Sequence, residues 1–235
     1  MTFPILAAMA QDASEVAVQA VLPVKEELSF SLISMAMKGG WIMLPLLLLS
    51  ILTIYIFGER WWAIRKASQI DENFMRNIHD YIHEGKIKAA INLCQTQETP
   101  IARLIEKGIE RIGRPLNDIQ TAVENMGNVE IARLEKGLPM LATIAGGAPM
   151  IGFLGTVIGM IQAFYNMSQA GSNVDITLLS GGIYTAMVTT VAGLIVGIIA
   201  YFGYNYLVAR IDNIVYKMES NTIEFMDLLH EPAGK

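Results

Sequence analysis

Threonines are the polar side chains with the most unusual surroundings in this sequence. Two runs without Asp, Glu, Lys, Arg or His, at residues 137–174 and 176–209, contain Thr143 and a group of four at similar depth: Thr156, Thr185, Thr189 and Thr190. A hydroxyl donates and accepts hydrogen bonds but does not titrate at ordinary pH. Each hydroxyl could simply bond to a carbonyl of its own helix. The clustering of the four favours a mildly polar, uncharged lining around an inner cavity.

The missing charges limit the chemistry that these runs can perform. A proton relay through a membrane needs a titratable side chain at depth, and neither run contains an acid, a base or a histidine. We therefore expect that the chain alone is neither a proton pump nor an ion-coupled carrier. If it serves proton flux, a partner must supply the carboxylate.

Small residues recur at intervals of four in the same runs and predict close helix packing. The positions in this pattern are Ala148, Gly152, Gly155 and Gly159 in the first run and Gly193 and Gly197 in the second. Pro149 removes one backbone hydrogen bond and frees the carbonyl of Ala145. This predicts a fixed kink in the first helix, or alternatively a hinge.

These features require elements that cross a membrane. A bilayer core of about 30 Å needs about 20 mostly apolar helical residues, and three uncharged segments meet this need: 39–58, 138–167 and 178–208. A chain of 235 residues is too short to enclose such helices as the core of a soluble protein. The predicted fold class is an all-α integral membrane protein with three transmembrane helices and long cytoplasmic helical extensions.

Lys and Arg near the span ends predict the orientation. They gather in 59–137 and 209–235, which we expect in the cytoplasm as a helical domain and a C-terminal helix. We expect the N-terminal tail, residues 1–38, and the turn at 168–177 on the periplasmic side. The tail contains a short amphipathic stretch, Ser29 to Lys38, and residues 1–10 could be the remnant of a signal peptide.

The predicted cytoplasmic parts show helical periodicity. Asp71 to Gln97 reads as two helices that separate at Gly85, and Leu116 to Leu138 reads as one helix that continues into the second span. A single helix is expected from Leu178 to about Leu229, far longer than a membrane is thick. Long helices with apolar stripes in a small chain favour self-association.

Two segments carry a resemblance to a known family. Leu141 to Gly159, LATIAGGAPMIGFLGTVIG, closely resembles the second-span motif of the ExbB/TolQ/MotA proton-channel family, and Gly181 to Gly197, GGIYTAMVTTVAGLIVG, resembles its third-span motif. The likeness extends over about residues 40–230 and is closest to the ExbB branch, the motor subunit of TonB systems, with TolQ very close.

The resemblance implies a homo-pentamer in the bacterial inner membrane whose second and third spans line a central pore. It implies an ExbD-like single-span partner with a membrane Asp in that pore, and a TonB-like protein through which the motor acts. Thr156 and Thr190 match the pore threonines that face this Asp. One departure is Thr185, which stands where the best-known family members have a pore-facing Glu. Either that acid is dispensable for proton flow, or this subfamily uses the hydroxyl instead.

Other functions find less support. His79 and His83 have a spacing that can hold a metal, but Asp80 and Glu84 beside them favour a solvated polar face. The single cysteine, Cys94, excludes an internal disulfide and favours a small buried residue. No motif predicts an enzyme or a cofactor, and no basic run predicts nucleic-acid binding. A TolQ-like envelope-maintenance motor, a flagellar stator and a passive scaffold or channel in membrane lipid remain alternatives to the ExbB-like role.

Overall fold

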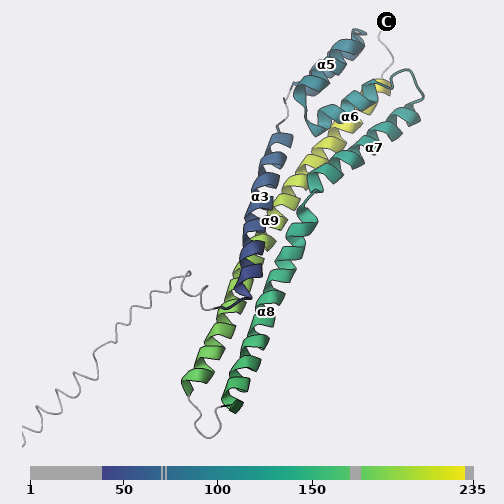
Figure 1. The fold of residues 1–235 in the computed structure, drawn as a ribbon. Coiled ribbons are helices and arrows are strands. Elements are labelled where there is room, and N and C mark those ends of the chain that lie inside the picture. Colours follow the sequence, from purple (N-terminus) through teal and green to yellow (C-terminus); the bar gives the residue numbers. More distant parts are fainter. Residues whose placement is uncertain (1–38, 70, 72, 170–175, 231–235) are drawn as a thin grey trace, which may run out of the picture. The chain divides into compact units, whose positions relative to one another are not determined.

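The longest element is α9 (Ile176–His230), a helix of 55 residues. At 1.5 Å per residue it extends about 80 Å, which confirms the prediction of one helix from Leu178 to about Leu229. It runs antiparallel to α8 (Leu138–Gln169), and the two helices lie side by side (Figure 1). This pair contains both uncharged runs that carry the threonines.

The computed structural model describes residues 39–69, 71, 73–169 and 176–230, which belong to one compact unit, Ala36–Lys235. The described ranges are built from helices, without strands. The predicted tail at 1–38 with its amphipathic stretch, residues 170–175 of the predicted turn, and residues 231–235 lie outside the described residues.

Three helical stretches are long and apolar enough to cross a membrane: α3 (Met43–Ala67), residues 116–169 and residues 179–230. Leu46 of α3 belongs to one buried cluster with Ile144 and Ala148 of α8 and Ala200 of α9. Another face of α3 presents large apolar side chains outward, among them Leu44, Leu47, Leu48, Ile51 and Ile54. Such a surface fits contact with lipid acyl chains better than contact with water.

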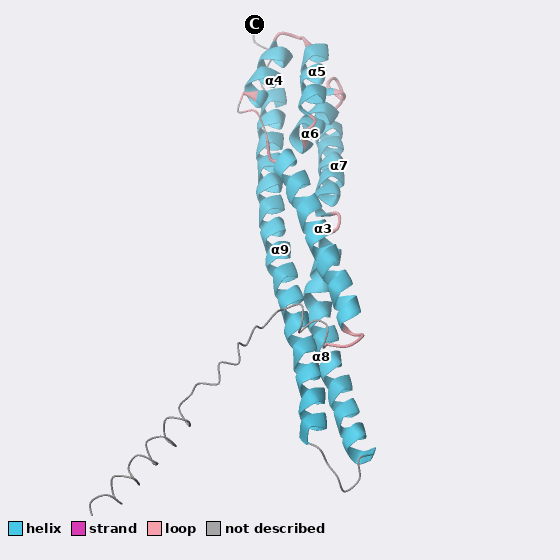
Figure 2. Ribbon diagram, turned by 60° about the vertical axis from the view of Figure 1, so that its left-hand side comes forward, coloured by secondary structure: helices cyan, strands magenta, loops and turns pink. Residues whose placement is uncertain are grey.

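Four shorter helices follow α3: α4 (Phe74–His83), α5 (Ile87–Gln97), α6 (Pro100–Ile109) and α7 (Leu116–Glu135) (Figure 2). The helices α4, α6 and α7 pack on the C-terminal part of α9, and α5 packs on α4 and α6. Their shared core includes Phe74, Ile105, Val123, Ile214 and Phe225. The predicted break at Gly85 is confirmed, because this glycine adopts a φ of +71° between α4 and α5.

Local capping explains where α6 begins. Thr99 precedes it in an extended conformation, and its hydroxyl accepts a hydrogen bond from the backbone N–H of Ala102 at 3.3 Å. Pro100 occupies the first helical position, where its missing N–H is tolerated.

The prediction that α7 continues straight into α8 is wrong. The helix ends at Glu135, Lys136 leaves helical geometry with a ψ of 126°, and Gly137 has a φ of +87°. Glycine is favoured at this position after a helix because a Cβ would be strained there. Pro139 follows within the first turn of α8, where proline starts a helix more readily than it continues one.

Candidate functional site

Backbone-to-backbone contact between α8 and α9 forms the centre of the membrane pair. A Cβ added to Gly193 would lie 2.6 Å from the carbonyl oxygen of Ala148, and one added to Gly152 would lie 2.9 Å from that of Thr189. Real Cβ atoms are not found so close to backbone oxygens, so only glycine fits at both positions. The small side chains therefore allow the two helix axes to approach closely.

The same contact continues in both directions along the pair. Towards the N-terminus of α9, Gly155 faces Thr189 and Gly159 faces Ala186; towards its C-terminus, Gly197 faces Pro149 and the carbonyl of Ala145. The six positions of the predicted small-residue pattern thus lie along one seam between α8 and α9.

Pro149 lies inside α8 without interrupting it. A proline at this position cannot donate to the carbonyl of Ala145. A Cβ on Gly197 would lie 3.0 Å from that carbonyl oxygen and 2.5 Å from the proline Cγ. Gly197 therefore fits against the face of α8 that the proline ring occupies, and the predicted kink at Pro149 stays a prediction.

Two of the threonines use their hydroxyls at this seam. Thr190 Oγ1 donates to the carbonyl oxygen of Gly152 across the seam at 3.0 Å. Thr189 Oγ1 donates to Ala186 O at 2.7 Å and lies 3.4 Å from Gly152 O. Thr189 is only 1% exposed, so within this subunit its hydroxyl is enclosed between α8 and α9 and reaches no free surface.

The remaining threonines differ in the side of the pair on which they lie. Ile151 and Ala192 pack on the cluster that includes Leu46 of α3. With 3.6 residues per turn, Thr156 and Thr190 fall on the opposite side of the seam, away from α3. Both are half-buried, and the hydroxyl of Thr156 donates to Phe153 O at 2.6 Å.

Thr185 falls on the other side of the seam from Thr156 and Thr190. It lies seven residues before Ala192 on α9, so two helical turns place it on the same side as that residue. Its side chain is half-buried. The four threonines therefore do not form one surface: two share the side away from α3, one is enclosed in the seam and one lies on the α3 side.

The chemistry available at this seam is hydrogen bonding without charge. The hydroxyl hydrogens of Thr156 and Thr190 are both donated to carbonyls, so their oxygens are left as acceptors. Hydroxyl acceptors at membrane depth can bind a proton-bearing group, but they cannot themselves take up and release a proton at ordinary pH.

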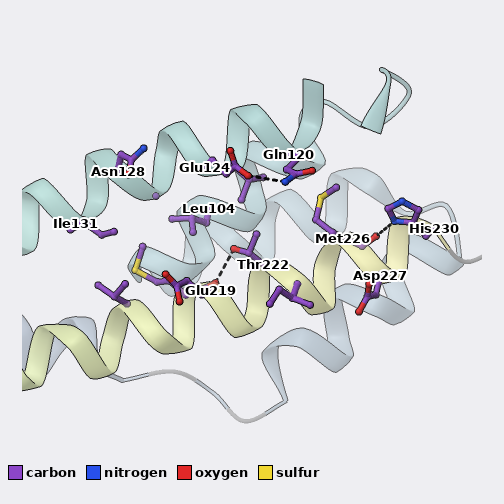
Figure 3. Close-up of a pocket in the computed structure, with 15 residues that line it drawn as sticks. Leu104, Gln120, Glu124, Asn128, Ile131, Glu219, Thr222, Met226, Asp227 and His230 are labelled. Atoms are coloured by element: carbon purple, nitrogen blue, oxygen red, sulfur yellow. Dashed lines mark hydrogen bonds between the residues drawn. The ribbon is translucent and has the colours of Figure 1, made fainter. Parts of the chain in front are cut away.

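A hollow of about 670 Å³ lies between α7 and α9, outside the uncharged runs (Figure 3). Its floor is apolar, and Glu124, Glu219 and Asp227 stand around it. Gln120 donates to Glu124 at 2.8 Å, and His230 Nδ1 lies 2.8 Å from the carbonyl oxygen of Met226. Gln120, Glu124 and His230 thus have partners on their own helices.

Metal ligands are not gathered anywhere in the part of the chain that the structure describes, since no three His, Cys, Asp or Glu side chains come close enough to hold an ion. His79 and His83 are exposed, with ring centroids 4.3 Å apart, and His79 Nδ1 lies 3.5 Å from Asp80 Oδ1. The pair occurs on the polar face of α4.

Sequence reasoning missed a buried acid outside the membrane runs. Glu130 on α7 is 1% exposed and accepts from Arg103 of α6 at 2.6 Å and from Arg133 at 2.7 Å. Arg60 of α3 donates to the carbonyl oxygen of Arg133 at 3.3 Å. The i, i+3 spacing of Glu130 and Arg133 was visible in the sequence, but the contact with Arg103 needs the fold.

Comparison with known proteins gives this arrangement a family. Residues 96–220, more than half of the chain, match the MotA/TolQ/ExbB proton channel family. This stretch contains α6, α7, all of α8 and most of α9.

Individual relatives agree with that match. An ExbB-like biopolymer transport protein of Synechocystis is 33% identical over 175 residues, covering 74% of this chain and 69% of the relative. The biopolymer transport protein ExbB of Neisseria meningitidis serogroup A is 27% identical over 176 residues, covering 69% and 78%. The Tol-Pal system protein TolQ of Haemophilus influenzae is 37% identical over 106 residues, covering 45% and 46%.

Family membership and three apolar helices together indicate an inner-membrane protein. The resemblance of the motifs around Thr156 and Thr190 is thereby confirmed at the level of the family. With its charge-free helix pair joined through glycines and threonines, the chain belongs to the MotA/TolQ/ExbB proton channel family.

Proposed function

We propose that this chain is the pore and stator subunit of a motor driven by the proton motive force, of the ExbB type. It works with an ExbD-like single-span partner and energises TonB-dependent outer-membrane transport through a TonB-like protein. The observation that carries the proposal concerns the uncharged runs of α8 and α9, which contain no acid, base or histidine. In a chain of a proton-channel family, they nevertheless present the hydroxyl oxygens of Thr156 and Thr190 on the side of the pair away from α3.

In this proposal five subunits surround a pore lined by α8 and α9. The side of the pair away from α3 carries Thr156 and Thr190 and faces the partner. Large apolar side chains elsewhere on the pair, including Phe153, Met160 and Leu194, are exposed in the single subunit. They supply the surface that neighbouring subunits, the partner helices and lipid cover.

The proposed proton carrier is a carboxyl group of the partner. Because the hydrogens of Thr156 and Thr190 are already donated to Phe153 O and Gly152 O, their oxygens accept hydrogen bonds and do not donate them. They therefore favour the protonated, neutral form of a carboxyl group over its ionised form. Thr185, where the family often has Glu, takes no part in proton exchange in this proposal.

The proposed orientation follows the distribution of Lys and Arg. Residues 59–137 and 209–235 lie in the cytoplasm, and the N-terminus and the turn at 168–177 lie in the periplasm. The helices α4–α7 and the C-terminal part of α9 then form a cytoplasmic extension of the pore.

The experiment that tests the proposal is the double substitution Thr156→Ala/Thr190→Ala, co-expressed with the partner. The double alanine variant should lose partner-dependent proton flux and growth on chelated iron. Its assembled complex should have the same subunit composition, measured by mass, as the wild-type complex. Thr156→Ser/Thr190→Ser should keep both functions because the hydroxyls remain. Thr143→Ala is a matched control, since Thr143 also lies on α8 and donates its hydroxyl hydrogen to Pro139 O of its own helix.

Normal growth of the double alanine variant on chelated iron would contradict the proposal. A TolQ-like role is the second candidate, because a TolQ protein is among the relatives. It predicts the same loss of proton flux but a defect in envelope integrity, measured as detergent sensitivity, with iron uptake intact. A passive scaffold predicts unchanged flux in every variant.

A further inference from the structure

Two hollows meet between α3 and α9 near the end of their uncharged runs. The first, of about 440 Å³, is lined by apolar side chains that include Ile54, Ile198 and Phe202. The second, of about 360 Å³, is lined by Trp61, Arg65, Ser68, Gln69, Tyr206 and Arg210. Tyr206 lines both hollows, so an apolar groove at membrane depth adjoins a basic pocket at the membrane edge.

Aromatic rings hold the two arginines of the pocket in place. The guanidinium of Arg65 lies over the ring of Trp61 at 5.3 Å, and that of Arg210 over the ring of Tyr206 at 5.4 Å. Arg210 also donates to the hydroxyl of Tyr206 through Nε at 3.3 Å and Nη2 at 3.1 Å. Stacking uses the face of a guanidinium and leaves N–H groups at its edge for an anion, and at Arg210 these are the N–H groups of Nη1 and the second N–H of Nη2.

The positive charge of these two arginines is not paired within the described residues. Within the described chain, neither has a carboxylate oxygen within 4.0 Å, whereas the neighbouring Arg60 pairs with Glu59 and Lys66 lies 3.6 Å from Glu98. The two cations come from helices that are about 145 residues apart in sequence. Their convergence on one pocket therefore leaves local positive charge that an anion can neutralise.

The position of the hollows selects the kind of anion. The uncharged runs end at Gly58 and Ala209, so the arginines stand just beyond the hydrocarbon region. Trp61 and Tyr206 are residues that favour the headgroup level. The groove beside them is exposed to the surroundings of the helices, with Ile54 66% and Phe202 69% exposed. A soluble anion has no acyl chain that could bind in this apolar groove, whereas a lipid has one.

We propose that an anionic phospholipid binds between α3 and α9, with its phosphate in the pocket of Arg65 and Arg210 and an acyl chain along Ile54, Ile198 and Phe202. Basic pockets between membrane helices are known to suit such headgroups. A zwitterionic phosphatidylcholine would bring a quaternary ammonium next to two arginines and bind less well. This site is independent of the threonine seam and of the proposed partner.

Native mass spectrometry of the full chain, released from detergent with equal amounts of phosphatidylglycerol and phosphatidylcholine, tests the proposal. Wild-type protein should retain phosphatidylglycerol in preference to phosphatidylcholine. Arg65→Gln and Arg210→Gln should each lower phosphatidylglycerol binding about fivefold, since one cation near a membrane surface contributes about that factor. The double variant should lower it about 25-fold, and Arg65→Lys/Arg210→Lys should retain most of it.

Lys66→Gln is the matched control, because Lys66 neighbours Arg65 on α3 but lines neither hollow. Its lipid binding should stay at the wild-type level. The proposal is overturned if Lys66→Gln loses as much phosphatidylglycerol binding as Arg65→Gln does. It is also overturned if both lipids bind equally, or if inorganic phosphate alone displaces the lipid. Circular dichroism checks the helix content of each variant; should the double variant fail to fold, the two single variants decide.

Discussion

Replacing Gly193 by alanine tests the seam between α8 and α9. The new Cβ would lie 2.6 Å from Ala148 O and 2.9 Å from the Cα of Gly152, and both of these atoms belong to the backbone. Ordinary contacts begin at about 3.4 Å. The helices must therefore separate locally by about 0.8 Å, since no side chain can rotate away.

This separation has two calculable consequences. The hydrogen bond from Thr190 to Gly152 O would lengthen from 3.0 Å to about 3.8 Å, beyond hydrogen-bonding range. A gap of 0.5–1 Å also forfeits about a quarter to a half of the dispersion energy of the atoms that it separates. Together with the usual cost of overpacking, we expect Gly193→Ala to lower the free energy of unfolding by about 2 kcal/mol.

The assay is titration of the purified protein in mild detergent with sodium dodecyl sulfate, followed by circular dichroism. Gly58→Ala is the matched control: Gly58 is a helical glycine of α3, and a Cβ there would meet no atom within 4 Å. Because alanine is the better helix former, this variant should be as stable as the wild type or more stable. Equal stability of Gly193→Ala and Gly58→Ala would refute the backbone-contact interpretation.

Two further predictions concern the helices outside the membrane runs. Burial raises the pKa of the Cys94 thiol from 9.0 to about 12, so at pH 8 its thiolate population falls about a thousandfold. Maleimide should therefore label Cys94 slowly in the native protein and rapidly after denaturation. Fast labelling of the native protein would contradict the burial of this thiol. Glu130→Ala leaves Arg103 without its buried partner and should lower the free energy of unfolding by about 3 kcal/mol. Glu110→Ala removes the exposed pair with Lys107 and should lower it by less than about 1 kcal/mol. Similar losses for both variants in thermal unfolding experiments would argue against a structural role for Glu130.

Much of the fold could be predicted because charge and periodicity are local properties of the sequence. The uncharged runs gave the membrane helices, and the unbroken apolar pattern of α9 predicted its length. The turn at Gly137 was missed because a glycine and a nearby proline also occur inside membrane helices, as Gly146 and Pro149 do here. Only the surrounding packing distinguishes an interruption from a tolerated residue.

The candidate site was predictable in composition but not in geometry. Spacing of four identified the glycines that line the seam, because such residues must share one face of a helix. It did not separate Thr189, which is enclosed, from its neighbour Thr190, whose hydroxyl crosses to Gly152. That distinction depends on where α8 lies relative to α9. The arginine pocket at Tyr206 likewise depends on α3 meeting the middle of α9.

Proton flux across liposomes, read with a pH-sensitive dye, tests the central claim most directly. The full chain is reconstituted alone or with its single-span partner, and a potential is imposed with potassium and valinomycin. We predict that the chain alone leaks no faster than empty liposomes, and that flux appears only when a partner with an intact membrane carboxylate is present. Steady proton conduction by the chain alone would contradict the account, because its membrane runs contain no acid, base or histidine to carry the proton.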